Sequence, residues 1–202
     1  MMTPSATQIA QAAATLQRRG VVLLPTDTIY GLHALAGNAD AVQRIVDIKG
    51  RGEDKPFVVI AASAAQLEHL GATLGARTRA ILDDLWPGPF TAVVPIRQPI
   101  AASRGASTIA VRVPDLEWLR ELLDRTGPLA STSANRSGEP PITDPKLISR
   151  DLRASIDGVV DAGVREGKPS TIVDFTGDEP RIIREGETFF TQKLWKTLWK
   201  TL

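Results

Sequence analysis

The sequence predicts an α/β fold in which helices flank a mixed parallel and antiparallel sheet. Predicted strands and helices interleave along the 202 residues, but they do not follow the strict β–α–β order of an all-parallel sheet. The length suits one well-buried domain, and no linker rich in Pro, Gly or Ser divides the chain. We therefore expect one domain over residues 1–190 and a short tail over residues 191–202.

Predicted helices are recognised by their caps. Ser5-Ala6-Thr7-Gln8 has the form of a capping box, and the helix that follows is expected to end at Gly20 as its C′ glycine. Asn38 is expected to cap a second helix that ends near Gly50, and Ser63 a third. Further helices are predicted over residues 77–85, from Pro114-Asp115 to about residue 125, and near residues 145–153.

Predicted strands are short runs of apolar and β-branched residues. They cover residues 21–24, 57–61, 90–96, 108–113, 158–161, 171–175 and 181–184. The breaker cluster Trp86-Pro87-Gly88-Pro89 must form a turn.

Composition excludes several classes of protein. Hydrophobic content of 43%, charged content of 23% and a formal net charge of +1 exclude a disordered chain and a strongly basic nucleic-acid coat, although a local positive cleft remains possible. The absence of cysteine excludes disulfides, zinc–thiolate sites and thiol nucleophiles. His33 and His69 are too few for a metal cluster, so no metal ligand is predicted.

Targeting signals are not recognised in the sequence. No apolar stretch approaches the ~20 residues that span a bilayer. The start of the chain lacks the basic and apolar regions of a secretion signal. A cytoplasmic protein without a membrane partner is therefore expected.

A dense polar cluster follows the first predicted strand. Thr26, Asp27, Thr28 and Tyr30 come directly after the apolar run 21–24, at the strand end where open α/β sheets place their ligand crevices. Lys49 and Arg51 then bring two cations to the end of the next helix, as a phosphate or carboxylate site requires. The structural alternative is a polar turn and a pair of cations that interact with the helix dipole.

Two further segments are candidates for the same site. Thr132-Ser133-Ala134-Asn135 follows the run Pro128-Leu129-Ala130-Ser131, which we interpret as a further short strand. Its small polar groups can bind phosphate or a nucleotide base, or can form an ordinary Asx or Ser/Thr turn. Arg112 lies between Val111 and Val113, and is equally well explained as a solvent-facing side chain or as an anion ligand. His33 is interpreted as a structural histidine, since no partner is spaced to form a catalytic triad.

Five motifs, in their order along residues 5–187, resemble those of the YrdC-like family. They are Pro25-Thr26-Asp27-Thr28-Ile29-Tyr30-Gly31-Leu32, Ile48-Lys49-Gly50-Arg51, Val111-Arg112-Val113-Pro114, Ser131-Thr132-Ser133-Ala134-Asn135-Arg136-Ser137-Gly138 and Ser170-Thr171-Ile172-Val173-Asp174. The combination of Lys-x-Arg with Ser-x-Asn is the family signature. The length is similar to that of the short TsaC-type members, and the extra C-terminal domain of longer members is not expected.

The resemblance implies a twisted mixed sheet with a deep, positively charged concave cavity. It also implies an L-threonylcarbamoyladenylate synthase, which forms threonylcarbamoyl-AMP and pyrophosphate from L-threonine, bicarbonate or CO2, and ATP. Mg²⁺ would arrive on the ATP phosphates. A separate transferase complex would then use the product to modify an adenosine of tRNA.

Residue roles follow from the resemblance, motif by motif. Lys49 and Arg51 would act in catalysis and bind the nucleotide. Threonine would be held by Thr28, Tyr30, Lys49 and Arg112. The remaining nucleotide contacts would come from Thr132, Ser133, Asn135, Ser170 and Arg184.

Two other functions are weighed against the synthase. An RNA-binding protein without catalysis would also use a positive concave surface, but net charge is near zero and aromatic content is 5%. Direct, weak tRNA binding stays open. A carbamoyl-adenylate-forming domain is the second alternative, although such proteins are longer and carry zinc fingers, which a chain without cysteine cannot form.

The tail reads as an amphipathic helix. On a helix, two tryptophans and three leucines fall within an arc of roughly 140°, and the lysines lie on the opposite side. The apolar residues are Leu194, Trp195, Leu198, Trp199 and Leu202. We expect this face to dock on the domain. A partner or self-association surface is the alternative, and a membrane-surface helix is the least favoured.

Overall fold

The computed structural model describes residues 2–50, 56–135 and 141–186. The tail predicted over residues 191–202 and the site candidate Arg51 lie outside the described residues. The strands are β1 (Val22–Pro25), β2 (Tyr30–Leu35), β3 (Val58–Ile60), β4 (Phe90–Pro95), β5 (Thr108–Arg112), β6 (Leu129–Ser133), β7 (Gly158–Val159), β8 (Thr171–Asp174) and β9 (Arg181–Arg184).

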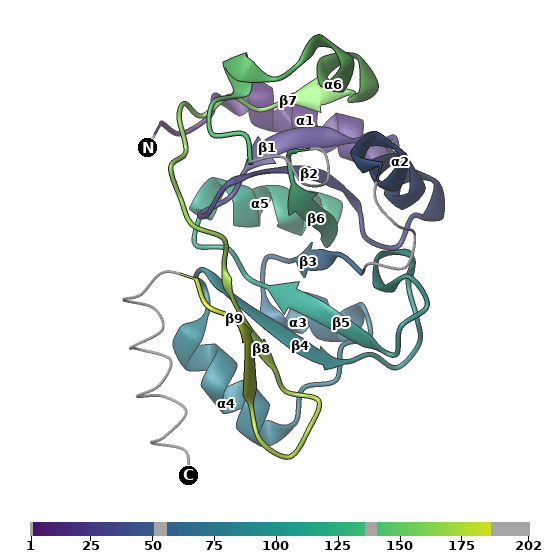
Figure 1. The fold of residues 1–202 in the computed structure, drawn as a ribbon, viewed down its shortest axis with the longest axis vertical. Coiled ribbons are helices and arrows are strands. Elements are labelled where there is room, and N and C mark those ends of the chain that lie inside the picture. Colours follow the sequence, from purple (N-terminus) through teal and green to yellow (C-terminus); the bar gives the residue numbers. More distant parts are fainter. Residues whose placement is uncertain (1, 51–55, 136–140, 187–202) are drawn as a thin grey trace.

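Within the described residues these nine strands form one open sheet, in the order β7-β1-β2-β6-β3-β5-β4-β8-β9. Three neighbouring pairs are parallel: β1 with β7, β3 with β5, and β4 with β8. The other five pairs are antiparallel. The mixed open sheet predicted from the sequence is therefore confirmed (Figure 1).

Helices cover the sheet and bury its apolar residues. They are α1 (Ala6–Gln17), α2 (Ala39–Lys49), α3 (Ala64–His69), α4 (Ala76–Leu85), α5 (Glu117–Thr126) and α6 (Arg150–Ser155), with 3₁₀ turns η1 (Ala101–Ser103) and η2 (Pro145–Leu147). Alternation along β1 explains how the first strand is buried on both faces. Leu23 packs into a cluster with α2, α3 and α4, while Val22 and Leu24 pack into a second cluster with α1 and α5. None of the described helices is long and apolar enough to cross a membrane.

The predicted helix caps are confirmed with one correction. Ser5 and Gln8 form the capping box of α1, and Asn38 and Ser63 accept backbone N–H bonds at the starts of α2 and α3. Gly20 is not the left-handed residue after α1, because Arg19 takes that conformation with φ 66°. Gly20 has another reason to be glycine, since a Cβ there would lie 2.6 Å from the side chain of Thr15.

Two elements differ from the sequence prediction. The sequence patterns did not predict β2, which pairs antiparallel with β1 and places Tyr30 opposite Pro25. The helix predicted near residues 145–153 is instead two pieces, η2 and α6. Ile148 is extended between them (φ −63°, ψ 139°), and the side chain of Ser149 accepts from Leu152 N to start α6.

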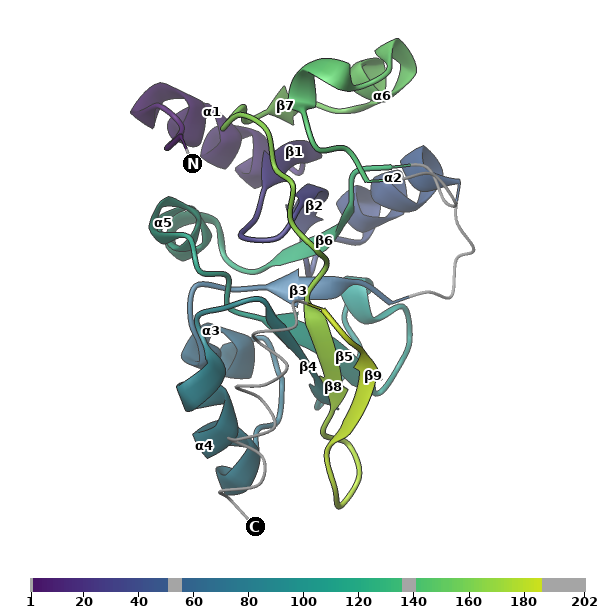
Figure 2. The ribbon, with the colours of Figure 1, turned by 60° about the vertical axis from the view of Figure 1, so that its left-hand side comes forward.

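A long connection carries the chain from one end of the sheet to the other. Residues 160–170, here called the strap, lead from β7 to β8 and cross in front of β6 and β3 (Figure 2). Tyr30 fastens the strap, because its hydroxyl donates to Gly163 O (2.8 Å) and accepts from Ala162 N (3.0 Å). Gly167 lies so close to the β1–β2 turn that a Cβ would overlap the carbonyl oxygen of Thr28. The strap therefore rests directly on the turn that carries the polar cluster.

Candidate active site

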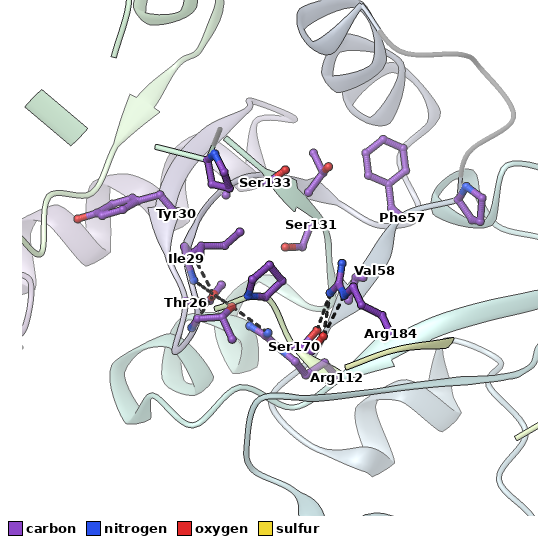
Figure 3. Close-up of a pocket in the computed structure, with 16 residues that line it drawn as sticks. Thr26, Ile29, Tyr30, Phe57, Val58, Arg112, Ser131, Ser133, Ser170 and Arg184 are labelled. Atoms are coloured by element: carbon purple, nitrogen blue, oxygen red, sulfur yellow. Dashed lines mark hydrogen bonds between the residues drawn. The ribbon is translucent and has the colours of Figure 1, made fainter. Parts of the chain in front are cut away.

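A cavity of about 230 Å³ opens between the β1–β2 turn, the middle strands and the end of the strap (Figure 3). Its wall combines hydroxyl groups and guanidinium groups with apolar side chains. The lining residues are Thr26, Thr28, Ile29, Tyr30, Gly31, Pro56, Phe57, Val58, Arg112, Ser131, Thr132, Ser133, Pro141, Pro169, Ser170 and Arg184. Sheet order explains this grouping, because β6 lies between β2 and β3 and brings its hydroxyls beside the β1–β2 turn.

Lys49 joins the two segments that the sequence analysis placed in one site. Its ammonium group donates to Ser133 O (2.7 Å), Asn135 Oδ1 (3.2 Å) and Ser133 Oγ (3.3 Å). Lys49 ends α2 but is only 6% exposed, so it is not a solvated cation at a helix end. The contact with Ser133 holds the positive charge at the edge of the cavity.

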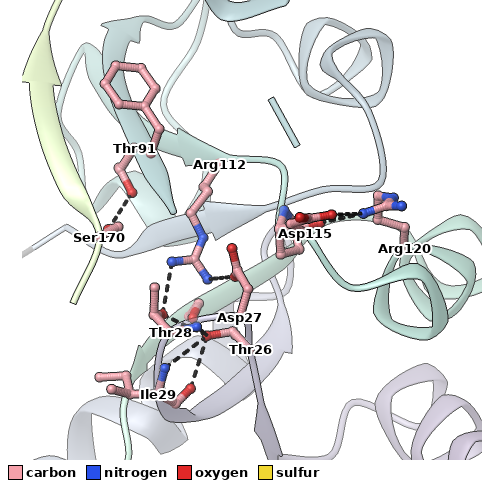
Figure 4. Close-up of polar contacts among 12 residues, drawn as sticks. Thr26, Asp27, Thr28, Ile29, Thr91, Arg112, Asp115, Arg120 and Ser170 are labelled. Atoms are coloured by element: carbon pink, nitrogen blue, oxygen red, sulfur yellow. Dashed lines mark hydrogen bonds and ion pairs between the residues drawn. The ribbon is translucent and has the colours of Figure 1, made fainter. Parts of the chain in front are cut away.

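Arg112 and Asp27 form a buried ion pair in the cavity wall (Figure 4). The guanidinium donates from Nη2 to Asp27 Oδ1 (2.8 Å) and from Nη1 to Thr28 Oγ1 (3.0 Å). Burial lowers the pKa of Arg112, and the Asp27 carboxylate opposes this shift. Arg112 is 5% exposed, which excludes the solvent-facing alternative and leaves a cation fixed in the wall.

Thr26 and Thr28 continue this network along the turn. The Thr26 hydroxyl donates to Ile29 O (3.0 Å) and lies 2.8 Å from the Thr28 hydroxyl. Both threonines are almost fully buried. The turn is thus held in one conformation by its own side chains.

Arg184 supplies a second guanidinium group to the cavity from β9, the strand at the opposite end of the sheet from β7 and β1. Its Nη2 and Nε donate to Ser170 O at 2.9 and 3.1 Å, and Nη2 also lies 3.3 Å from Ser170 Oγ. The Ser170 hydroxyl is 2.8 Å from the buried hydroxyl of Thr91. Burial lowers the pKa of Arg184, and the nearby charge of Arg112 lowers it further. Two cations therefore influence each other at this cavity.

Tyr30, which is predicted to hold threonine, lines the cavity and also bonds to the strap. Its ring is fully buried and its hydroxyl, bonded to the strap, points away from the cavity centre (Figure 3). Burial, the largest effect, raises the pKa of the phenol, so it stays protonated and donates to Gly163 O. Tyr30 positions the strap over the cavity.

His33 is a buried structural residue, as predicted. The imidazole is completely buried, with Nδ1 3.0 Å from Gly31 O and Nε2 3.0 Å from Ser131 Oγ. Burial lowers the pKa of His33 to about 3, and the positive charge of Arg112 lowers the pKa as well. Hydrogen bonding to the backbone carbonyls of Gly31 and Val22 opposes this shift, with Gly31 having the larger effect. The ring is therefore neutral at pH 7.

The structure brings most of the predicted site residues together. Seven of them line the cavity: Thr28, Tyr30, Arg112, Thr132, Ser133, Ser170 and Arg184. Lys49 and Asn135 attach to it through their contacts at Ser133. Asp27 belonged to the predicted polar cluster but was given no role, and Ser131 and Thr91 were not predicted as site residues. Strand alternation was the available signal for Ser131, since it lies on the same face of β6 as Ser133.

Sequence comparison finds related proteins over most of the chain. The Sua5, YciO and YrdC family model, described as telomere recombination, matches residues 14–186. A threonylcarbamoyl-AMP synthase of Bacillus subtilis is 39% identical over 184 residues, which are 89% of this chain and 53% of that protein. One of Pyrococcus abyssi is 36% identical, over 89% of this chain and 54% of that protein. The chain thus spans about half the length of these two curated relatives.

Solved structures share the fold. A crystal structure of Pyrococcus abyssi Sua5 complexed with L-threonine superimposes with a TM-score of 0.85 at 33% identity, covering 94% of this chain and 58% of that chain. Escherichia coli YciO superimposes with a TM-score of 0.80 at 26% identity, covering 92% of both chains.

Proposed function

Because the chain belongs to the Sua5/YciO/YrdC family, we propose that it is an L-threonylcarbamoyladenylate synthase. It forms threonylcarbamoyl-AMP and pyrophosphate from L-threonine, bicarbonate or CO2, and ATP. Relatives that carry this name and the Sua5 complex with L-threonine support the proposal. The product would pass to a tRNA threonylcarbamoyl transferase complex in the cytoplasm.

The contacts of Lys49 are the observation that carries the proposal. A single ammonium group bonds to both Ser133 and Asn135, so the Lys-x-Arg and Ser-x-Asn segments meet although they are far apart in sequence. Hydroxyl, amide and ammonium groups are the donors that phosphate oxygens accept from. Lys49 and, by its spacing, Arg51 are proposed to hold the phosphates of ATP, with Thr132, Ser133 and Asn135 near the nucleotide.

The two guanidinium groups suit the carboxylate of an amino acid. We assign Arg112 and Thr28 to threonine, with Tyr30 acting through the strap, and Ser170 and Arg184 to the wall shared by threonine and nucleotide. Ile29, Phe57 and Val58 supply apolar surface for the methyl group of threonine. L-serine, which lacks this methyl, should lose ~1–3 kcal/mol of transition-state binding.

The reaction needs positioning and charge neutralisation more than a strong base. The threonine amine attacks the carbon of CO2 and loses a proton, which gives a carbamate. A carbamate oxygen then bonds to the α-phosphorus as the bond to pyrophosphate breaks. The first step creates an anion and the second brings it against the anionic triphosphate, so fixed cations lower the barrier. The lining residues offer guanidinium and hydroxyl groups, which do not form a carboxylate site for Mg²⁺. The ion would therefore be carried by the phosphates of ATP, as Mg²⁺ commonly is.

Pyrophosphate release tests the proposal. ATP is supplied with L-threonine and bicarbonate, and each is then omitted in turn, with L-serine as the alternative amino acid. We expect release only when all three substrates are present, and a lower kcat/KM with serine. ATP hydrolysis that ignores threonine would exclude this function. Salt-sensitive tRNA binding without turnover would favour the RNA-binding alternative.

A further inference from the structure

A hollow of about 640 Å³ lies between η2, α6 and β7, at the end of the sheet where β7 is the edge strand (Figure 1). It shares no lining residue with the candidate active site. Four of its lining residues are apolar: Pro145, Ile148, Ala154 and Val159. Ile148 and Val159 also pack against the hydrophobic core, so the apolar floor of this hollow is a fixed part of the fold.

The rest of the lining is cationic. Lys146, Arg150 and Arg153 are all exposed, and among the described residues none of these three side chains forms an ion pair. Asp144 and Asp151 are close in sequence but do not line the hollow, and the side chain of Asp144 accepts from Lys146 N at the start of η2. Three positive charges therefore surround an apolar floor.

A second hollow of about 510 Å³ continues the first toward α1. Arg153 and Val159 line both hollows, and Arg18 adds a fourth cation on the α1 side. The carboxylate in this part, Asp157, is paired with Arg44 at 2.8 Å, so its charge is already balanced. The two hollows together form an elongated surface, here called the β7 groove, at the end of the molecule where α1, α6 and β7 lie together (Figure 2).

We propose that the β7 groove binds an acidic amphipathic segment of another protein. An apolar centre within a polar rim is the usual anatomy of a protein–protein interface, and charge complementarity across the rim selects the partner. Leu147 lies between two lining residues and is 76% exposed, so apolar surface extends beyond the floor. A segment with leucine-like side chains on one face and carboxylates beside them satisfies both the floor and the rim. This inference does not depend on the reaction proposed for the cavity.

Two other occupants match the groove less well. The tail over residues 191–202 contains Lys193, Lys196 and Lys200 and no acidic residue, so the cationic rim repels it. RNA is attracted by cations, but its phosphates gain nothing from an apolar floor. No aromatic side chain on which a base could stack lines either hollow. Charge and apolar surface together therefore favour an acidic protein segment.

A designed peptide tests the proposal on the full chain. The probe is a helix of about four turns with leucine on one face and glutamate on the other. One matched peptide has lysine in place of glutamate, and a second has serine in place of leucine. By fluorescence anisotropy we expect only the original peptide to bind, and its affinity to fall as salt is added. Failure of the original peptide to bind, or equal binding of the lysine peptide, would overturn the proposal.

Variants of the protein locate the binding surface. Arg150→Glu and Arg153→Glu should each weaken the original peptide about fivefold, because an exposed ion pair is replaced by like charges. Leu147→Ser should weaken it about tenfold through lost apolar contact, and the fold should tolerate this change at so exposed a position. Arg181→Glu is the matched control, because it reverses the charge of a side chain that is 79% exposed in β9, at the other end of the sheet.

The control should change the Kd of the peptide by less than about twofold. An equal loss in Arg181→Glu, or no loss in the three groove variants, would show that the peptide binds elsewhere and would overturn the assignment. A duplex RNA oligonucleotide is titrated in the same way. RNA that binds more tightly than the peptide, and that is weakened by Arg150→Glu but not by Leu147→Ser, would overturn the protein partner in favour of RNA.

Discussion

The ammonium group of Lys49 lies 2.7 Å from the carbonyl oxygen of Ser133, although the two residues are 84 positions apart. This contact ties the end of α2 to the end of β6 and places a buried charge beside the cavity. Lys49 is only 6% exposed, and oxygen atoms of Ser133 and Asn135 accept the hydrogen bonds of its ammonium group in place of water. Lys49 therefore affects both the fold and the proposed chemistry.

Replacement of Lys49 should reduce activity and stability together. Lys49→Ala should lower kcat/KM by on the order of 10²-fold, because a charge-stabilising group is lost. It should also lower the free energy of unfolding by ~1–3 kcal/mol, because buried oxygens lose their donor. Lys49→Met is the matched variant, since it keeps an unbranched apolar stem of similar length and removes the ammonium group with its charge and its hydrogen bonds. Wild-type turnover in both variants would contradict a role in catalysis.

Breaking the buried ion pair between Asp27 and Arg112 should lower the stability of the fold more than breaking an exposed pair. Asp27→Ala leaves Arg112 charged and buried, so the free energy of unfolding should fall by ~3–5 kcal/mol in urea denaturation. Arg44→Ala is the control, because it breaks the pair with Asp157, in which both side chains are about two-fifths exposed. That change should cost about 1 kcal/mol or less. Equal effects of the two changes would show that the Asp27 pair is not buried in solution.

Acid should destabilise the fold through His33. The folded-state pKa of His33 is about 3, below the ordinary value of 6.5, so between these values the unfolded chain binds a proton that the folded chain does not. The contribution of His33 is present above pH 6.5 and is lost as pH falls toward 3. From pH 7 to pH 5 the loss is about 2 kcal/mol.

Urea denaturation at pH 7, 6 and 5 measures this dependence. His33→Gln should remove this part of the pH dependence, whereas His69→Gln, at an exposed position, should keep it. If the wild type and His33→Gln lose stability in parallel between pH 7 and pH 5, His33 is not buried in its neutral form.

The contact between the strap and the β1–β2 turn should tolerate no side chain. In Gly167→Ala the new Cβ would overlap the carbonyl oxygen of Thr28, so the strap must move and carry Pro169 and Ser170 with it. We expect a loss of ~1–3 kcal/mol in stability and a raised KM for threonine. Gly37→Ala is the control, because nothing lies within 4 Å of a Cβ there. Identical behaviour of the two variants would mean that the strap does not rest on the turn.

Most of the fold was predictable because local signals were strong. Helix caps at Ser5, Asn38 and Ser63 and the apolar strands gave the mixed sheet without any knowledge of the pairing. The strand β2 was missed because its residues are polar and small on one face, with Gly31 and His33, and do not form an apolar run. Gly20 was misread as a left-handed glycine because close packing and left-handed backbone both favour glycine.

The site was predictable as a set of motifs but not as a set of contacts. Residue patterns made Lys49 and Ser133 candidates for one site and left Arg112 undecided between solvent and cavity, and only the resemblance to the YrdC-like family joined the three. Burial decides that question, and burial depends on sheet order, which no single motif encodes. The roles of Asp27 and Ser131 were missed because they come from their partners, Arg112 and His33.

The order of the strands determines when the cavity is completed during synthesis. Its wall draws on Thr28, near the start of the chain, on Ser170, at the end of the strap, and on Arg184, in β9. Pairing of β4 with β8 and of β2 with β6 closes long loops, and such non-local contacts form slowly. A ligand stabilises only a chain that can already bind it. The nascent chain must therefore fold through its apolar faces alone, and neither ATP nor an amino acid can assist until the last strands have been made.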